Sequence, residues 1–186
     1  MESDANVIAR SVDQPAVFRV LFDRYFAEVH RYLVNRLAEP AVAEELAAET
    51  FVRAFAARDR YRDRESGTRA WLFTIATNLL RDEARARGRR RSVLDRLARE
   101  RETVDAPSLG ADPELEIALE ELPAHEREAL LLFAWADLSY EEIAVVLGVR
   151  IGTVRSRIHR ARTKLRARLE PGAGSSTIAS VGRAVP

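Results

Sequence analysis

The residues from Ser139 to Leu169 constrain the fold more than any other stretch of this 186-residue chain. Ser139 and Glu142 have the spacing of a capping box, in which each side chain bonds the backbone amide of the other residue at the start of a helix. Gly148 follows a short apolar run, where glycine can adopt the left-handed conformation that ends a helix. The pattern predicts a short helix that stops at Gly148 and a longer helix from about Ile151.

The second of these helices has seven basic residues and a histidine between Gly152 and Leu169, and no acid. Solvated helices usually mix both signs, because opposite charges four residues apart stabilise a helix and like charges repel. Val154 and Ile158 would pack on Ile143 of the first helix and leave the basic face exposed. This is a helix-turn-helix pattern, whose second helix enters the major groove of DNA with its first turns. The residues expected to contact duplex DNA are Thr153, Arg155, Ser156, Arg157, His159 and Arg160. Of these, Arg157 is expected to contact a phosphate.

Apolar residues recur every three or four positions through the amino-terminal half of the chain, and this period predicts helices. One apolar stripe follows Pro15 and ends near Pro40. A second helix is expected over about 41–58, and a third begins near Arg69. Trp71 shares the spacing of the apolar residues in the third helix, which favours a place in the core. Together the three helices carry enough apolar surface for a compact bundle.

The chain is therefore predicted to be all-α, with two small helical domains and a flexible linker that is rich in Pro, Gly and Ser. The expected divisions are a disordered leader over 1–14, a first helical domain over 15–91, a linker over 92–112, a helix-turn-helix domain over 113–169 and a disordered tail over 170–186.

Composition excludes several classes of function. The chain has no cysteine, and its three histidines lie far apart, so neither disulfides nor a metal site is expected. No glycine-rich phosphate loop or catalytic constellation is present, and we expect neither a cofactor nor enzyme activity. There is no apolar run long enough for a bilayer and no signal peptide, which indicates a cytoplasmic protein without membrane insertion.

The net charge of +1 conceals a segregation of charge along the chain. Nine arginines stand against four acids over 81–101, nine acids against one arginine over 102–128, and eight basic residues against no acid over 149–169. Two separated basic segments indicate contact with nucleic acid at two places.

The sequence also resembles a known family. Region 4 of the small bacterial sigma factors of the extracytoplasmic-function group, within the sigma-70 family, is similar to LPAHEREALLLFAWADLSYEEIAVVLGVRIGTVRSRIHRARTKL. Region 2 of the same group is similar to FRVLFDRYFAEVHRYL, AEELAAETFVRAF and TRAWLFTIATNLLRDEARARGRRR. The resemblance covers about residues 18–169. It implies a two-domain sigma factor that binds core RNA polymerase, reads the −35 element as duplex and captures the melted −10 element.

The resemblance further implies two sets of site residues in the first domain. Those for single-stranded −10 DNA are Arg62, Asp63, Ser66, Gly67, Thr68, Asn78 and Arg81. Those for RNA polymerase are Glu45, Ala48, Glu49, Val52 and Arg53. Two positions depart from the family pattern, because Ala48 replaces a usual glutamine and Thr77 stands where arginine often precedes the asparagine.

Family membership would also imply an anti-sigma protein as a partner. Two other readings of the residues stay open. One is a helix-turn-helix regulator with an amino-terminal dimerisation or sensing bundle, and the other is an adaptor that binds polymerase without reading promoters.

Overall fold

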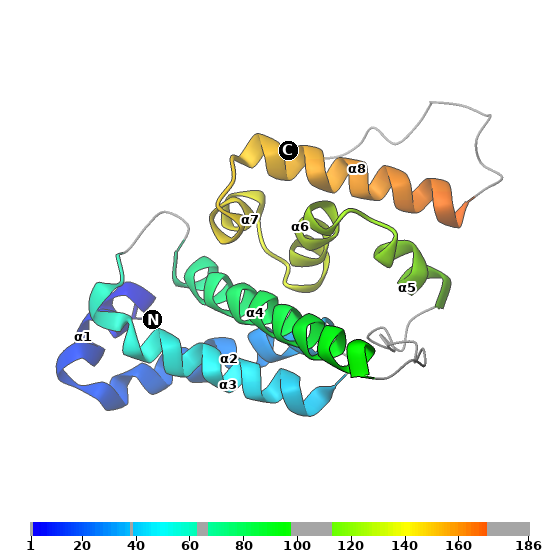
Figure 1. The fold of residues 1–186 in the computed structure, drawn as a ribbon. Coiled ribbons are helices and arrows are strands. Elements are labelled where there is room, and N and C mark those ends of the chain that lie inside the picture. The colour runs from blue at the N-terminus through cyan, green and yellow to red at the C-terminus, as the bar shows by residue number, and fades with distance from the viewer. Residues whose placement is uncertain (1, 38, 63–66, 98–112, 171–186) are drawn as a thin grey trace, which may run out of the picture.

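The computed structural model describes residues 2–37, 39–62, 67–97 and 113–170, and within these ranges it contains helices and no strand (Figure 1). The prediction of an all-α chain with two helical domains is confirmed. The α-helices are α1 (Asp4–Asp13), α2 (Arg19–Val34), α3 (Pro40–Ala56), α4 (Gly67–Leu97), α5 (Pro113–Glu120), α6 (Ala124–Trp135), α7 (Tyr140–Leu147) and α8 (Ile151–Leu169). Two 3₁₀ turns, η1 (Pro15–Phe18) and η2 (Arg58–Arg60), follow α1 and α3.

Helices α1 to α4 form one group around an apolar core. The periodic residues of the sequence line this core, and the fully or nearly fully buried ones include Leu21, Val29, Leu33, Ala47, Phe51, Leu72 and Phe73. Phe22 and Phe26 of α2 place their rings against Phe51 of α3, with ring centres 5.1 and 5.9 Å apart. Helix α3 starts at Pro40, which suits the first turn because a proline has no amide hydrogen to leave unpaired.

The leader is a helix, and the prediction of disorder for residues 1–14 is wrong for 4–13. Ser3 caps α1 by accepting a hydrogen bond from the amide of Asn6, and Val7 and Ile8 are buried. Tyr25 of α2 donates a hydrogen bond to Asp4, and burial together with this bond raises the pKa of the Tyr25 hydroxyl above its ordinary value. The apolar spacing in this segment is typical of a helix, but its acidic and polar residues favoured a prediction of disorder.

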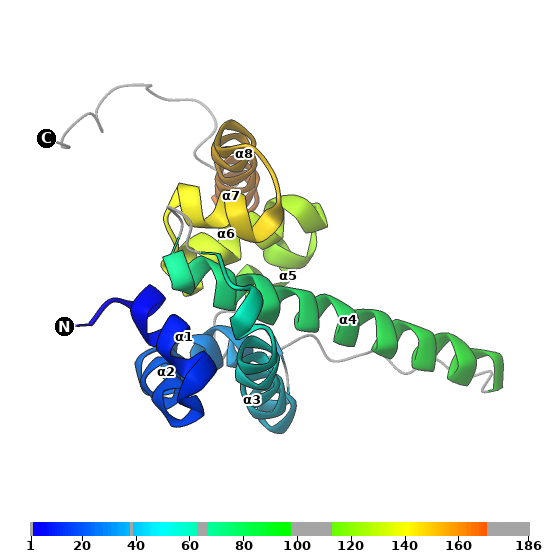
Figure 2. The ribbon, with the colours of Figure 1, turned by 90° about the vertical axis from the view of Figure 1, so that its left-hand side faces the viewer.

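Helix α4 is longer than expected and runs from Gly67 to Leu97, through residues 92–97 that the sequence assigned to the linker. It continues past the other helices in Figure 2. Trp71 lies on its first turns, where it is half-buried and packs against the core, with its ring centre 4.8 Å from that of Tyr61. The rest of the predicted linker and the tail from residue 171 lie outside the described residues.

Helices α5 to α8 form the second group. Ser139 and Glu142 make the predicted capping box at the start of α7, and Gly148 ends this helix with a φ of 65° in the left-handed region. Val154 and Ile158 of α8 are buried with Ile143 of α7. The helix-turn-helix is therefore built as the sequence indicates.

The two groups are packed against each other, with α4 between them (Figures 1 and 2). Helix α7 lies on the amino-terminal half of α4, and α6 lies near α2. This docking was not foreseen from the sequence, which suggested two separate domains.

Candidate nucleic-acid interface

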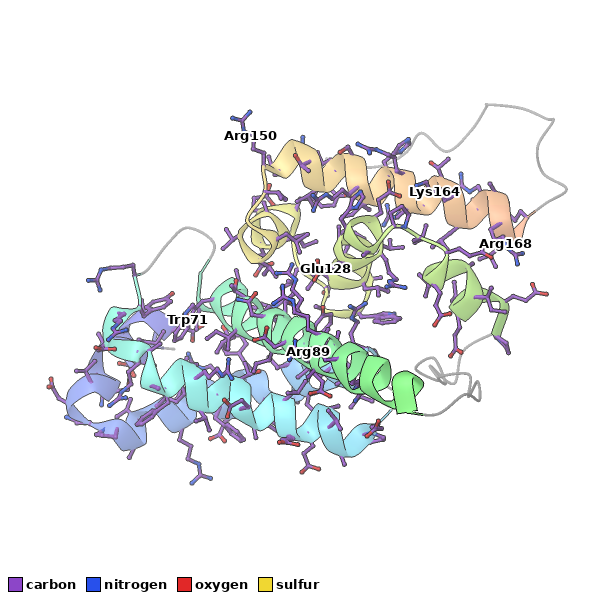
Figure 3. All side chains as sticks on the ribbon, viewed as in Figure 1. Trp71, Arg89, Glu128, Arg150, Lys164 and Arg168 are labelled. Atoms are coloured by element: carbon purple, nitrogen blue, oxygen red, sulfur yellow. The ribbon has the colours of Figure 1, made fainter. Side chains whose placement is uncertain are left out.

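The start of α8 presents a basic surface to solvent. Arg155, His159 and Arg160 are exposed, while Thr153, Ser156 and Arg157 are half-buried. The structure therefore brings all six residues expected to contact duplex DNA onto the first turns of one helix. Arg150 precedes them without capping the helix through its side chain and extends away from it in Figure 3.

Contacts within the protein orient part of this surface. The Ser156 hydroxyl donates to the carbonyl of Thr153 at 2.9 Å and accepts from Arg160 Nη2 at 3.3 Å. The Arg155 guanidinium lies 6.0 Å from the centre of the Tyr140 ring. Within the described part of the chain, no carboxylate comes within ion-pair distance of Arg155 or Arg157. Their charges stay available for a polyanion.

The other side of α8 is held to α6 and α5 by ion pairs. Lys164 Nζ lies 2.8 Å from an oxygen of Glu126, whose side chain is only 3% exposed. Arg160 Nη1 lies 3.9 Å from the second oxygen of Glu126, and Arg168 Nε lies 3.1 Å from an oxygen of Glu121, the residue that directly follows α5. Figure 3 shows Lys164 and Arg168 on the side of α8 that faces these helices. The rear of the helix is thus anchored, and Arg160 takes part in this anchoring although it belongs to the six residues expected to contact DNA.

The residues expected to contact single-stranded DNA are partly dispersed. Arg62 and Asn78 are exposed, and Gly67 has a φ of 70° that only glycine adopts without strain. Thr68 is 3% exposed and shares a hydrogen bond of 3.1 Å with the Tyr61 hydroxyl, so its side chain faces inward. Asp63 and Ser66 lie outside the described residues. Thr77 is fully buried and cannot supply a surface contact.

A pocket of about 340 Å³ lies beside this segment. Its walls come from both groups of helices, because Val145 of α7 faces the first turns of α4 across it. The residues that line it are Arg60, Tyr61, Arg62, Gly67, Trp71, Thr74 and Val145. Tyr61 and Trp71 place aromatic rings there, and such rings are common stacking platforms for unpaired bases.

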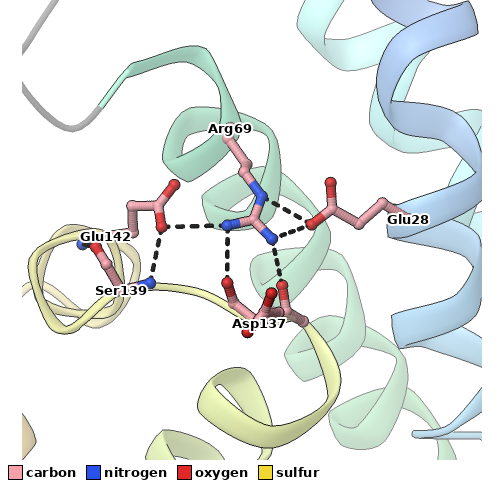
Figure 4. A network of polar contacts seen from close by, with 6 residues as sticks. Glu28, Arg69, Asp137, Ser139 and Glu142 are labelled. Carbon is pink, nitrogen blue, oxygen red and sulfur yellow. Dashed lines mark hydrogen bonds and ion pairs between the residues drawn. The ribbon is translucent and has the colours of Figure 1, made fainter.

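Arg69 joins the two groups of helices, as Figure 4 shows. Its Nε and Nη2 donate to Glu28 of α2, the former at 2.7 Å. Nη2 also donates to the carbonyl of Ala136 at 2.6 Å, and Nη1 to that of Asp137 at 2.9 Å. Nη1 lies 3.2 Å from Glu142, the same carboxylate that caps α7. Burial lowers the pKa of Arg69, but the bonds and charges of Glu28 and Glu142 outweigh burial and raise that pKa.

Arg81 makes a second connection between the two groups, through two hydrogen bonds to one carboxylate of α6. Its Nε and Nη2 each lie 2.9 Å from one oxygen of Glu128, and its Nη1 lies 3.3 Å from Asn78 Oδ1. The hydrogen bonds that Arg81 donates to Glu128 raise the pKa of Arg81 above its ordinary value, in spite of partial burial. Arg81 and Asn78, both expected to contact single-stranded DNA, are thus brought together but engaged with the protein itself.

The exposed side of α3 carries the residues expected to bind polymerase. Val52 is 60% exposed, which is unusual for a large apolar side chain. Arg53 Nε donates to Glu49 at 2.8 Å, and Glu45 and Ala48 are exposed on the same helix. All five residues lie on α3, and the interior of the bundle does not use their side chains.

The described residues hold no group of histidines and carboxylates that could bind a metal ion. Among the helices of the described ranges, none has the length and hydropathy needed to cross a bilayer.

Comparisons with known proteins agree with this geometry. Residues 21–91 match the family described as Sigma-70 region 2, and residues 114–165 match Sigma-70, region 4. The chain is 33% identical over 171 residues to the ECF RNA polymerase sigma factor SigL of Mycobacterium tuberculosis, which covers 89% of the chain and 96% of that protein. The chain belongs to the ECF sigma factors. Its role is that of a sigma factor, in promoter recognition and transcription initiation.

Other similar proteins point the same way. The ECF sigma factor SigE of Mycolicibacterium smegmatis is 43% identical over 136 residues, which is 67% of this chain but half of that protein's length. Among solved structures, CnrH in complex with the cytosolic domain of CnrY has a TM-score of 0.68 at 28% identity, over 92% of this chain and all of that one. The sigma factor RpoE in complex with the anti-sigma factor NepR, from Bartonella quintana, has a TM-score of 0.64 at 29% identity, over 83% and 98%.

Sequence reasoning missed the acidic half of the interface in this sigma factor. Glu28, Glu128 and Glu142 were not singled out for any role beyond a helix cap. Their arginine partners lie 41 to 73 residues away in the sequence, so no local pattern connects them. The one available signal was the acidic segment over 102–128, which follows a basic one and complements its charge.

Proposed function

We propose that this sigma factor binds core RNA polymerase through α3, reads duplex −35 DNA with the start of α8, and captures single-stranded −10 DNA beside the pocket on α4. The observation that carries the proposal is that the basic start of α8 and a face of α3 with exposed Glu45 and Val52 and half-buried Glu49 lie on separate helical groups of one chain. A simple helix-turn-helix regulator needs only the first of these surfaces.

Each surface has the chemistry for its task. Arginine forks can bond guanine edges or phosphates in the major groove, and Arg155 and Arg160 stand exposed where α8 would enter it. Unpaired bases stack on aromatic rings, which Tyr61 and Trp71 supply at the wall of the pocket. The free energy of binding unpaired bases can offset the loss of base pairing in the duplex, so promoter opening needs no catalytic residue. The polymerase performs the nucleotidyl transfer.

The proposal places the chain in the cytoplasm with polymerase. It also includes an anti-sigma partner. Two of the similar solved structures are complexes, CnrH with the cytosolic domain of CnrY and RpoE with the anti-sigma factor NepR. Such a partner would compete for the surfaces of α3, α4 and α8.

Run-off transcription by bacterial core RNA polymerase, with and without the chain, tests the proposal. Promoter-dependent transcripts are expected only with the chain. Arg155→Ala should weaken binding to a promoter duplex by roughly 1–3 kcal/mol at one base pair and leave other sequences unaffected. Glu141→Gln, a change on the exposed side of α7, serves as the control. Duplex binding without any promoter-dependent initiation would favour the helix-turn-helix regulator instead.

A further inference from the structure

Three buried side-chain atoms in the described part of the chain have no hydrogen-bond partner, and they lie in one region. They are the Tyr32 hydroxyl, the Nε of Arg36 and the Thr77 hydroxyl. Tyr32 and Arg36 are one turn apart on α2, and Thr77 of α4 lies close enough to Tyr32 to act on the pKa of its hydroxyl, which burial raises. A buried donor without a partner costs free energy, so such groups usually bond to the protein or to a bound molecule. Their grouping favours a ligand site at this place.

Arg36 also lacks an acidic partner. Among the described residues, no carboxylate lies within ion-pair distance of Arg36 or of Arg127 on α6. The two arginines are close enough to repel, because burial first and then the charge of Arg36 lower the pKa of Arg127. Glu120 and Glu128 act in the opposite direction, each more weakly. An anion beside both arginines would replace this repulsion by attraction.

A pocket of about 230 Å³ opens beside Arg36. Arginines and apolar side chains line it, namely Arg36, Leu37, Leu80, Arg81, Ala84 and Arg87. Arg81 is bonded to Glu128 at 2.9 Å. Arg87 is bonded to Glu83, also at 2.9 Å. Of the arginines that line the pocket, Arg36 is therefore the one whose charge is available to a ligand, and apolar walls stand next to it.

A phosphate group matches this combination of charges. It carries about −1.5 to −2 charges near neutral pH and has three strong acceptor oxygens, and arginine binds it through two parallel hydrogen bonds. A carboxylate would neutralise one of the two arginines, whereas a phosphate dianion neutralises both. The apolar walls suit an organic group attached to the phosphate. The pocket is smaller than the roughly 300–1,000 Å³ of common ligand sites, which favours a small molecule over a run of nucleotides.

We propose that this pocket binds a small phosphate monoester, with its phosphate between Arg36 and Arg127 and its organic part against Leu37 and Leu80. The site is here termed the phosphate pocket. It is a different place from the surfaces proposed for DNA and polymerase, with which it shares Arg81, and the carboxylate of Glu128 already holds that arginine. The inference does not rest on the proposed function, because binding can be measured on the free chain.

The phosphate pocket has a defined consequence for stability. A ligand that binds only the folded chain raises its stability with the ligand concentration. Without the ligand, the folded chain carries the repulsion between Arg36 and Arg127. With the ligand, both arginines gain a counter-ion. Removing the charge of Arg36 should therefore help the chain slightly in the first condition and harm it in the second.

Calorimetric titration of the full chain at constant ionic strength tests binding, with phenyl phosphate and inorganic phosphate as probes. The parent should bind phenyl phosphate several-fold more tightly, because the ring adds apolar contact. Arg36→Gln should weaken the binding of phenyl phosphate about ten- to a hundredfold, and Arg127→Gln less. The matched control is Arg31→Gln, which removes an exposed arginine from the same helix and should leave the affinity unchanged. Equal affinity in the parent and Arg36→Gln would overturn the site.

Thermal unfolding separates binding from a purely structural role of Arg36. Without phosphate, Arg36→Gln should unfold at the temperature of the parent or slightly above it. With saturating phenyl phosphate, the parent should unfold at the higher temperature. A variant that is less stable than the parent by the same amount in both conditions would show that Arg36 serves only the fold. Equal stabilisation of the parent and Arg36→Gln by phosphate would be a general salt effect, and either result would overturn the proposal.

Competition with DNA identifies the source of the phosphate. A labelled single strand should keep its affinity in Arg36→Gln and should not displace phenyl phosphate from the parent. A strand that displaces phenyl phosphate, and that loses as much affinity as phenyl phosphate does in Arg36→Gln, would assign the pocket to a nucleic-acid backbone and overturn the small-molecule site. A failure of the proposed function would show separately, as missing promoter-dependent transcripts with phenyl phosphate binding intact.

Discussion

Arg69 and Arg81 of α4 differ from Arg155 at the start of α8 in what holds them. On α4, Arg69 and Arg81 are bonded to carboxylates of other helices, and each is less than two-fifths exposed. On α8, Arg155 is exposed and lies near the Tyr140 ring of α7, and no carboxylate of the described residues pairs with it. Composition alone made the two helices look alike. Their surroundings differ, because carboxylates of the protein occupy Arg69 and Arg81 of α4, whereas Arg155 of α8 is open to solvent.

Helix α6 lies at the centre of this difference, because it serves both arginine-rich helices. Glu126 faces α8 and holds Lys164, while Glu128 faces α4 and holds Arg81. Two carboxylates two positions apart point to opposite sides of a helix segment. Helix α6 thus holds one side of α8 through Glu126 and covers part of α4 through Glu128.

Salt should separate the two helices most strongly. If α8 makes about six phosphate contacts, raising salt from about 50 to 200 mM should weaken duplex binding roughly a thousandfold, through counterion release. The ion pairs of Arg69 and Arg81 are partly buried and should be screened much less. Closure, the docking of the two helical groups on each other, can be followed by the distance between spin labels on Glu44→Cys of α3 and Ile117→Cys of α5, two exposed positions in a chain without cysteine. Fluorescence anisotropy with a duplex, beside this label distance, measures both effects across one titration. Parallel loss of binding and closure would contradict the comparison.

Exchanging the charges of the Arg81–Glu128 pair should give the next largest effect. Arg81→Glu and Glu128→Arg, each alone, place like charges face to face and should open the domains. The double exchange should restore closure, with a coupling of about 1–2 kcal/mol after allowance for partial exposure. The distance between labels measures closure in all four chains. Additive effects, with no recovery in the double variant, would show that the pair does not hold the interface.

Much of the fold could be predicted because its signals are local. The capping box at Ser139, the turn at Gly148 and the three-to-four spacing of Leu21, Val29 and Leu33 each depend on neighbours within one or two turns. The same kind of pattern placed on one helix the six residues that are expected to contact duplex DNA. Such signals are readable because the helix fixes where its own residues point.

The rest depends on long-range contacts. Thr68 was expected at a nucleic-acid surface and instead bonds Tyr61 inside the protein. Arg69 and Arg81 could not be matched with their carboxylates, because an ion pair between distant helices leaves no period in the sequence. Helix α1 was hidden for a different reason: its apolar residues are few, and packing on the bundle stabilises it rather than its own propensity.

The smallest expected effect comes from Glu126→Gln, and it sharpens the contrast between the two sides of α6. The buried carboxylate loses its charge opposite Lys164, which is half exposed and can turn to water, so the free energy of unfolding should fall by only about 0.5–1 kcal/mol. Chemical denaturation measures this change. Glu126→Gln should leave the label distance unaltered, whereas Glu128→Gln should lengthen it with little loss of stability. If Glu126→Gln opened the domains as well, α6 would act as one unit, and its two carboxylates would not divide the helices between them.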